Sequence, residues 1–264
     1  MKTTEITVLK KPELNNPIFI EGLPGVGYIG RNVAGYLIDT LKAEKFAELH
    51  SFHFPPVAML DSDKTGKMSA LKNEFYFYKA KNKTEKDMII LIGDAQSMDP
   101  VGHYEISKEV INFIKEFKPE MVLTLGGFAT GKLDNKTQTV FGAAVKDEII
   151  TKFGKKGIKF KDTNIGQIIG ASGLMVLEAE KNDIDAVCLM GETSGMLLSD
   201  PKATESVLEF ITKYFKLKID MSKIEEKVKE TGDVIKKIES LQKKLTSQSM
   251  PKQSKDDEHL GYIG

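Results

Sequence analysis

Short apolar runs alternate along this chain with amphipathic helical patterns. Several runs, such as MIILIG and AVCLMG, are continuously apolar and end in glycine. Such runs are typical of strands that are buried on both faces of a sheet. The segments expected to form strands are residues 6–10, 17–21, 46–52, 74–80, 87–93, 120–127 and 184–191.

Three segments between these strands carry apolar residues at helical spacing. They are Val33, Ala34, Leu37, Ile38 and Leu41; Ile106, Val110, Ile114 and Phe117; and Val207, Ile211, Tyr214 and Phe215. Pro201 follows Ser199 and Asp200, which places it in the first turn of the third helix. The alternation of strands and helices predicts an α/β fold with a mostly parallel sheet flanked by helices on both faces.

The pattern changes near residue 220, where charged residues surround one narrow apolar stripe. The stripe has alternating spacings of four and three residues, interrupted by Thr231 and Gln242, over about three heptads. Its apolar members are Ile224, Val228, Ile235, Ile238 and Leu245. Two interpretations remain open. The helix of residues 220–246 packs on its own domain, or it pairs with another subunit as an oligomerisation seam.

The last residues, 247–264, contain almost no apolar side chain before Leu260. Such a composition cannot form a packed core and predicts a disordered tail. The chain is therefore divided into a globular α/β domain (1–219), an amphipathic C-terminal helix (220–246) and a flexible tail (247–264).

Composition narrows the class of protein further. The chain has 264 residues, 41% of them hydrophobic, and its 38 basic residues balance 38 acidic residues. A net charge of zero gives no attraction to nucleic acid or to an anionic membrane. Apolar runs are too short for a membrane span and no signal peptide is recognised, so a cytoplasmic protein is expected. The lone Cys188 lies in an apolar run and is expected to be a buried structural thiol.

One motif suggests ligand chemistry. Gly25, Gly27 and Gly30 match the GxGxxG pattern after a strand and before a helix, where backbone N–H groups can hold a phosphate. The acidic residue that should close the next strand of a dinucleotide site is missing, since Glu48 falls in the middle of that strand. Glycines needed for a tight turn and close helix packing are the alternative.

Other candidate chemistry is sparse. Glu192 stands in a second glycine-rich strand end, but no nucleophile–base pair accompanies it. His50 and His53 are three residues apart on a strand, hence on opposite faces, and cannot chelate one metal ion. We expect no cofactor, no metal and no enzymatic activity.

Five segments together carry a resemblance to a known family: GLPGVGYIGRNVAGYLI, FHFPPVAM, LGGFATG, GLMVLEA and GETSGML. They resemble the proteasome assembly chaperone family, in its archaeal branch, whose members are sometimes labelled ATP-grasp proteins. The similarity covers residues 5–215 and the end of the tail. It implies a nucleoside-phosphorylase-like α/β fold, a homo-oligomer, and a non-catalytic role in docking on proteasome α-subunits through C-terminal tails.

The resemblance also gives the final residues a role. Proteasome-docking tails end in a hydrophobic residue, a tyrosine and any last residue, and the terminal carboxylate pairs with a lysine of the α-ring. The matching end of this chain is Leu260, Gly261, Tyr262, Ile263 and Gly264. Tyr262 is third from the end rather than second, which moves the carboxylate one residue, ~3.5 Å, further from the ring.

Two other functions remain open. A phosphorylase-like enzyme could hold a nucleoside or phosphate in a loop built from Gly25, Gly27, Gly30 and Glu192. An interaction protein could also use the same tail to bind some other partner.

Overall fold

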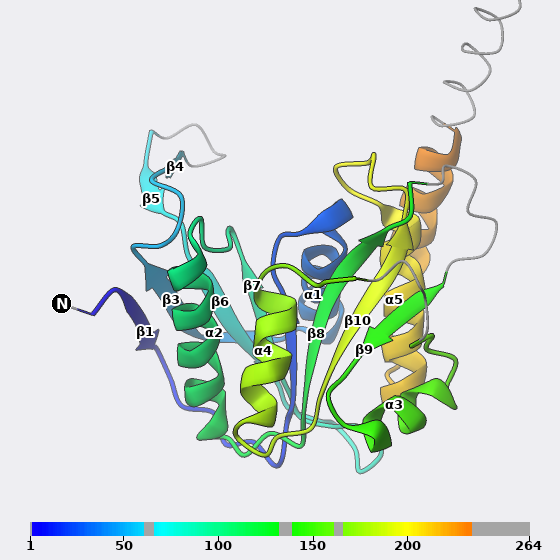
Figure 1. The fold of residues 1–264 in the computed structure, drawn as a ribbon, viewed down its shortest axis with the longest axis horizontal. Helices are drawn as coiled ribbons and strands as arrows, with labels where there is room; N and C mark the ends of the chain where they lie inside the picture. The colour runs from blue at the N-terminus through cyan, green and yellow to red at the C-terminus, as the bar shows by residue number, and fades with distance from the viewer. Residues whose placement is uncertain (1, 61–65, 132–138, 161–165, 234–264) are drawn as a thin grey trace, which may run out of the picture.

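An eight-stranded sheet forms the centre of the molecule, and helices cover both of its faces (Figure 1). The computed structural model describes residues 2–60, 66–131, 139–160 and 166–233. The order across the sheet is β1-β3-β6-β7-β2-β8-β10-β9. The strands are β1 (Thr4–Val8), β2 (Ile18–Gly22), β3 (Glu44–Ser51), β6 (Asn73–Tyr78), β7 (Met88–Gly93), β8 (Met121–Ala129), β9 (Val140–Ala143) and β10 (Ala186–Thr193).

The four central strands, β7, β2, β8 and β10, are parallel to one another. Strands β1, β3 and β6 extend the sheet on one side through antiparallel pairings, and β9 does so on the other. Each segment expected to form a strand does so, although β1 and β3 begin two residues earlier than predicted and β10 begins two residues later. The predicted α/β class with a helix-flanked sheet is confirmed.

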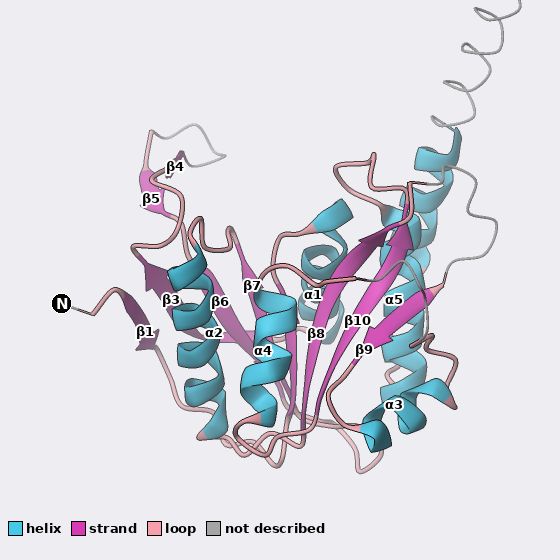
Figure 2. Ribbon diagram, viewed as in Figure 1, coloured by secondary structure: helices cyan, strands magenta, loops and turns pink. Residues whose placement is uncertain are grey.

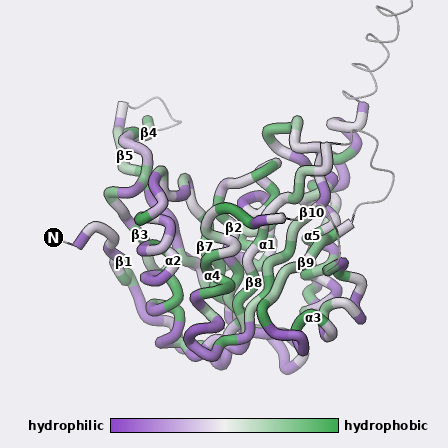
Figure 3. The backbone as a smooth tube through the Cα atoms, viewed as in Figure 1, coloured by the Kyte–Doolittle hydropathy of each residue, from purple (hydrophilic) through white to green (hydrophobic). Residues whose placement is uncertain are grey.

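The two faces of the sheet carry separate hydrophobic cores. Ile18 and Ile20 of β2 point to one face and Phe19 to the other, as a period of two requires. The first core packs α1 (Ile29–Leu41), α3 (Asp147–Gly154) and α5 (Pro201–Phe215); the second packs α2 (Pro100–Lys115) and α4 (Ala171–Glu180) (Figure 2). Figure 3 shows the hydrophobic colour concentrated along the central strands.

Besides the 3₁₀ turn of Val26–Tyr28, five helices and strands in the described part of the chain were not predicted: α3, α4, β9 and the two short strands β4 (Ala58–Leu60) and β5 (Met68–Ala70). Helix α4 reads LMVL through its middle, so no apolar stripe marks it. Strands β4 and β5 pair only with each other, in an antiparallel hairpin separate from the main sheet. No helix in the described part of the chain is long and apolar enough to cross a membrane.

The predicted C-terminal helix is described over residues 222–233, separated from α5 by residues 216–221. Ile224 is only 4% exposed and belongs to the first core, and the Tyr36 hydroxyl donates to the carbonyl of Asp220 at 2.6 Å. The first turn of this helix therefore packs on its own domain, which is the first of the two interpretations left open for this segment. Val228 is half-buried, while Ile235, Ile238 and Leu245 lie outside the described residues.

Candidate functional site at the carboxyl ends of the parallel strands

The glycine-rich segment after β2 makes a tight turn into α1. Residues Val26–Tyr28 form one 3₁₀ turn, in which the N–H of Tyr28 donates to the carbonyl of Gly25 at 3.0 Å. Gly27 has φ 63° and Tyr28 has φ 52°, both in the left-handed region. Glycine adopts that conformation without steric cost, so the turn itself explains Gly27.

Two other glycines allow backbone segments to touch. A Cβ atom on Gly30 would lie 2.4 Å from the carbonyl oxygen of Leu125, and one on Gly22 would lie 2.3 Å from that of Gly30. These contacts let α1 pack directly against β2 and β8. Gly25 is different, because its nearest atom would be Gln96 Nε2 at 4.0 Å. Tight turning and close packing thus account for Gly27 and Gly30, and a phosphate-binding loop is not needed to explain either.

This geometry predicts that Gly30→Ala and Gly25→Ala differ sharply in stability. The alanine at 30 must push helix α1 off a backbone carbonyl, which should lower the free energy of unfolding by about 1–3 kcal/mol. Gly25 has an extended φ of −162° and free space, so Gly25→Ala should stay within about 0.5 kcal/mol of the original chain. Urea denaturation of both variants measures the difference, and equal losses would contradict the packing argument.

Two side chains hold the neighbouring loops together. Gln96, after β7, donates from Nε2 to the carbonyl of Pro24 at 2.7 Å and accepts from the N–H of Ala171 at 2.9 Å. Asp200 donates its N–H to the carbonyl of Gly27 at 2.9 Å, and its carboxylate accepts from Thr193 Oγ1 at 2.6 Å. The glycine turn is therefore braced from both sides by hydrogen bonds within the chain.

Beneath this turn lies a buried carboxyl group that sequence reasoning missed. Glu21 of β2 is fully buried; its Oε1 accepts from the N–H of Leu23 at 2.9 Å and its Oε2 from Ser172 Oγ at 3.2 Å. Burial removes water from the carboxylate and raises the pKa of Glu21 to about 7, although these hydrogen bonds oppose the rise. The sequence signal was a single glutamate inside the apolar run PIFIEGL.

Two acidic residues that follow or end neighbouring strands, Glu192 and Asp94, lie in separate places. Glu192 lies opposite Phe128 in the β8–β10 pairing and donates its N–H to the carbonyl of Thr139. Asp94, at the end of β7, instead lies on the α1 side, 3.8 Å from Arg31. Strands β2 and β8 stand between β7 and β10, so Asp94 and Glu192 do not line one cleft.

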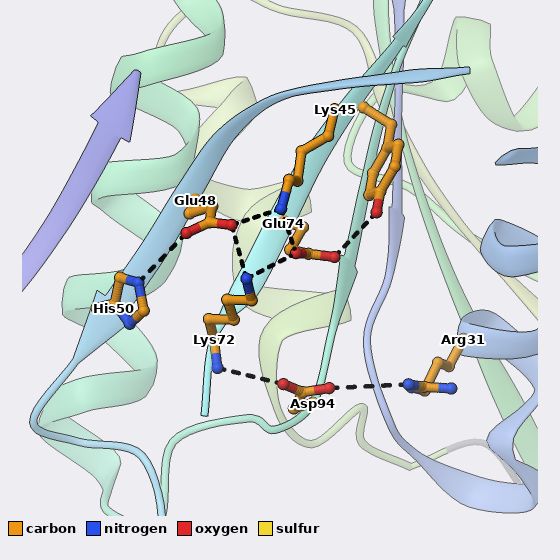
Figure 4. A network of polar contacts seen from close by, with 8 residues as sticks. Arg31, Lys45, Glu48, His50, Lys72, Glu74 and Asp94 are labelled. Atoms are coloured by element: carbon orange, nitrogen blue, oxygen red, sulfur yellow. Dashed lines mark hydrogen bonds and ion pairs between the residues drawn. The ribbon is translucent and has the colours of Figure 1, made fainter. Parts of the chain in front are cut away.

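Asp94 and Arg31 line a hollow of about 430 Å³ between α1, β6 and the helix of residues 222–233. On its β6 side lies a network of charged groups (Figure 4). Lys45 and Lys72 each contact both Glu48 and Glu74, at 2.6 and 3.0 Å.

These contacts shift the ionisation of the whole network. Hydrogen bonds from Lys45 and Lys72 lower the pKa of Glu48 to about 2. Burial raises the pKa of the Tyr76 hydroxyl, which donates to Glu74, to about 12. Each charge in the network therefore has a partner of opposite sign, and Glu48 serves this network rather than a ribose.

The two histidines have separate partners. His50 lies 3.8 Å from Glu48, whereas His53 Nδ1 contacts Asp99 Oδ2 at 2.7 Å and its Nε2 lies 3.4 Å from Glu105. Asp99 caps α2 by accepting from the N–H of Gly102, and its hydrogen bond raises the pKa of His53. Among the described residues, no three His, Cys, Asp or Glu side chains group as metal ligands.

Comparison with known families decides where this fold belongs. Residues 19–239 match the PAC2 family. The chain belongs to the PAC2 family. This confirms the predicted resemblance to proteasome assembly chaperones.

Solved structures resemble this PAC2 protein over nearly its whole length. PbaB of Pyrococcus furiosus, an archaeal proteasome activator, is 34% identical, with 90% of this chain and 100% of that chain covered and a TM-score of 0.83. PbaA of the same organism, an archaeal homolog of proteasome-assembly chaperone, is 27% identical, with 94% and 96% covered and a TM-score of 0.72. An uncharacterized protein of Methanocaldococcus jannaschii is 37% identical over 95% of this chain and 93% of its own length.

The predicted docking residues of this PAC2 protein, 260–264, lie outside the described residues. The sites described above consist of hydrogen-bonded loops and ion pairs, and the partners in these contacts come from the chain itself. Gly25 and Glu192 are the members of the predicted ligand loop that packing does not explain.

Proposed function

We propose that this protein is a non-catalytic partner of the proteasome, which docks on the α-ring of the core particle through its C-terminal tail. The observation that carries the proposal is the similarity to PbaB, 34% identical and covered over its full length. Similarity to PbaA is lower in both identity and TM-score. This ranking favours an activator-like role on assembled core particles over a role confined to assembly.

The chemistry of the tail supports the same proposal. Tyr262 and Ile263 are large apolar side chains at the end of a segment too polar to bury them by itself. Aromatic anchors that enter pockets dominate the binding energy of such interfaces. A tail that becomes ordered only on binding loses entropy, so a single tail binds weakly. Several tails on one oligomer raise the effective concentration and strengthen binding by roughly 10²–10⁴-fold.

The test uses purified core particles from the same organism. Full-length protein and a chain that ends at Asp257 are each mixed with immobilised particles, and hydrolysis of a short fluorogenic peptide is followed in parallel. The full-length protein should be retained and should raise hydrolysis, while the shortened chain does neither. Retention without faster hydrolysis would replace the activator by an assembly chaperone, and equal retention of both chains would exclude tail docking.

We also propose that the tails are gathered by a homo-oligomer, to which residues beyond Val228 contribute. The apolar spacing of Ile235, Ile238 and Leu245 supports this seam. The proposed seam begins at Val228, because Ile224 packs into the core of its own domain. A chain that ends at Asp233 keeps Ile224 in the core of its own domain and should form a smaller or more weakly associated assembly by native mass spectrometry. An unchanged oligomer would exclude the seam and leave association to the domain.

A further inference from the structure

The hairpin of β4 and β5, here called the arm, has an unpartnered apolar face. Every residue of both strands is exposed. The pairings Ala58–Ala70 and Leu60–Met68 place four apolar side chains on one face, and Met59 and Ser69 point to the other. Figure 1 shows the arm standing beyond the ends of β3 and β6.

Such an arm is poorly stable by itself. A two-stranded hairpin in water is marginal unless a third strand or another surface covers it. The base is fixed, because Phe54 and Leu71 are 7% and 9% exposed in the second core. Farther out, Leu60 and Met68 are 70% and 73% exposed. The base of the arm is thus anchored in the core, while its apolar face stands in solvent.

A second exposed apolar surface lies at the same edge of the sheet. Its members, here called the patch, are Phe52, Met98, Val101 and Tyr104, each 65–71% exposed. The patch is continuous around His53: Phe52 precedes it, Met98 donates its N–H to the His53 carbonyl at 2.9 Å, and Asp99 contacts its ring. Val101 and Tyr104 are three residues apart and share one side of α2.

We propose that the arm of one copy of this chain packs on the patch of a second copy. Both surfaces consist of uncharged side chains, and every copy has one arm and one patch. A single type of contact, repeated by symmetry, therefore covers the arm and the patch of every copy. The arm does not cover its own patch, since both are exposed within the single chain.

The charged residues near the two surfaces and the exposed area of these surfaces both support a second copy of the chain as the partner. Lys67 directly precedes β5 of the arm, and Asp99 and Glu105, 44% and 32% exposed, border the patch. Opposite charges at a rim favour the correct pairing. The apolar face of the arm and the patch together expose six large side chains. At roughly 100 Å² each they supply about 600 Å² per copy, or about 1,200 Å² for the two partners, the lower end of a standard interface. This inference does not depend on binding to the proteasome.

A photo-crosslink decides whether arm and patch meet. Met68 of the full-length chain is replaced by p-benzoylphenylalanine, and in a control Ser69, on the other face of the arm, is replaced instead. Equal amounts of ¹⁴N- and ¹⁵N-labelled protein are mixed, irradiated and digested for mass spectrometry. We expect mixed-isotope cross-links from position 68 to residues 98–104, at least fivefold more than from position 69. Cross-links within one chain only, or between copies through other segments, would overturn the proposal.

Charge substitutions give an independent measurement. Met68→Glu and Val101→Glu should each raise the dissociation constant between copies at least tenfold in analytical ultracentrifugation. Ser69→Glu should leave that constant within about twofold of the original. Circular dichroism confirms that the variants remain folded, which is expected because all three positions are on the surface. Equal association of Met68→Glu and Ser69→Glu would overturn the proposal.

Discussion

Replacing Tyr262 with alanine should reduce binding to proteasome α-rings at least 30-fold and leave fold and oligomer unchanged. The removed ring is the anchor of the proposed docking tail, and loss of such an anchor costs about 2 kcal/mol or more. The measurement is biosensor binding of full-length protein to immobilised α-rings, with a thermal melt of the same sample.

Two further variants sharpen this result. Tyr262→Phe keeps the ring and should retain most of the binding. Extension of the chain by a few residues beyond Gly264 should weaken binding if a lysine pairs with the terminal carboxylate. If Tyr262 instead packs on its own domain, Tyr262→Ala will lower the melting temperature and leave partner binding unaffected, and the docking proposal fails.

The second large expected effect is a pH dependence of the free energy of unfolding that is caused by Glu21. Burial raises the pKa of Glu21 to about 7 in the folded chain from an ordinary value of 4.5. Below pH 4.5 the group is protonated in both the folded and unfolded chain. Between pH 4.5 and 7 the unfolded chain releases the proton and the folded chain keeps it, so the free energy of unfolding falls as pH rises. The loss reaches about 3 kcal/mol and levels off above pH 7.

Comparison of the original chain with Glu21→Gln isolates this contribution. The raised pKa of His53 also lowers stability as pH rises, but it is common to both proteins and cancels in the difference. We expect the stability of Glu21→Gln relative to the original to increase by about 3 kcal/mol from pH 4.5 to 8 in urea denaturation. Glu44→Gln, at a side chain 65% exposed, is the control and should show no such trend. A pH-independent difference for Glu21→Gln would contradict the assignment.

The strongly patterned elements could be predicted because one physical signal marks them. Strand β7 is an unbroken apolar run, and α1 has one apolar stripe; both appear where expected. Helix α4 was missed because its apolar residues surround the helix, so periodicity does not distinguish it from a strand. Three-residue strands such as β4 are too short to show a period at all.

The site was harder to predict than the fold, because its contacts join distant segments. The glycine pattern was visible, but only the 2.4 Å approach of Gly30 to Leu125 shows what that glycine does. The Lys45–Glu48–Lys72–Glu74 network needs the register of β3 and β6. Gln96 bridges Pro24 and Ala171, which lie 72 and 75 positions away from it along the chain. No local sequence pattern encodes contacts over such separations.

The burial of Cys188 has a practical consequence for measuring the proposed contacts. This thiol, the one cysteine of the chain, is 1% exposed, and burial raises its pKa to about 12. Because the thiolate is the reactive form, maleimide dyes should leave the native protein unlabelled at neutral pH. A cysteine introduced in the tail or the arm would then take up a single fluorophore without removal of the native one. Distances between copies, and between tail and ring, become measurable by energy transfer on an otherwise unaltered chain.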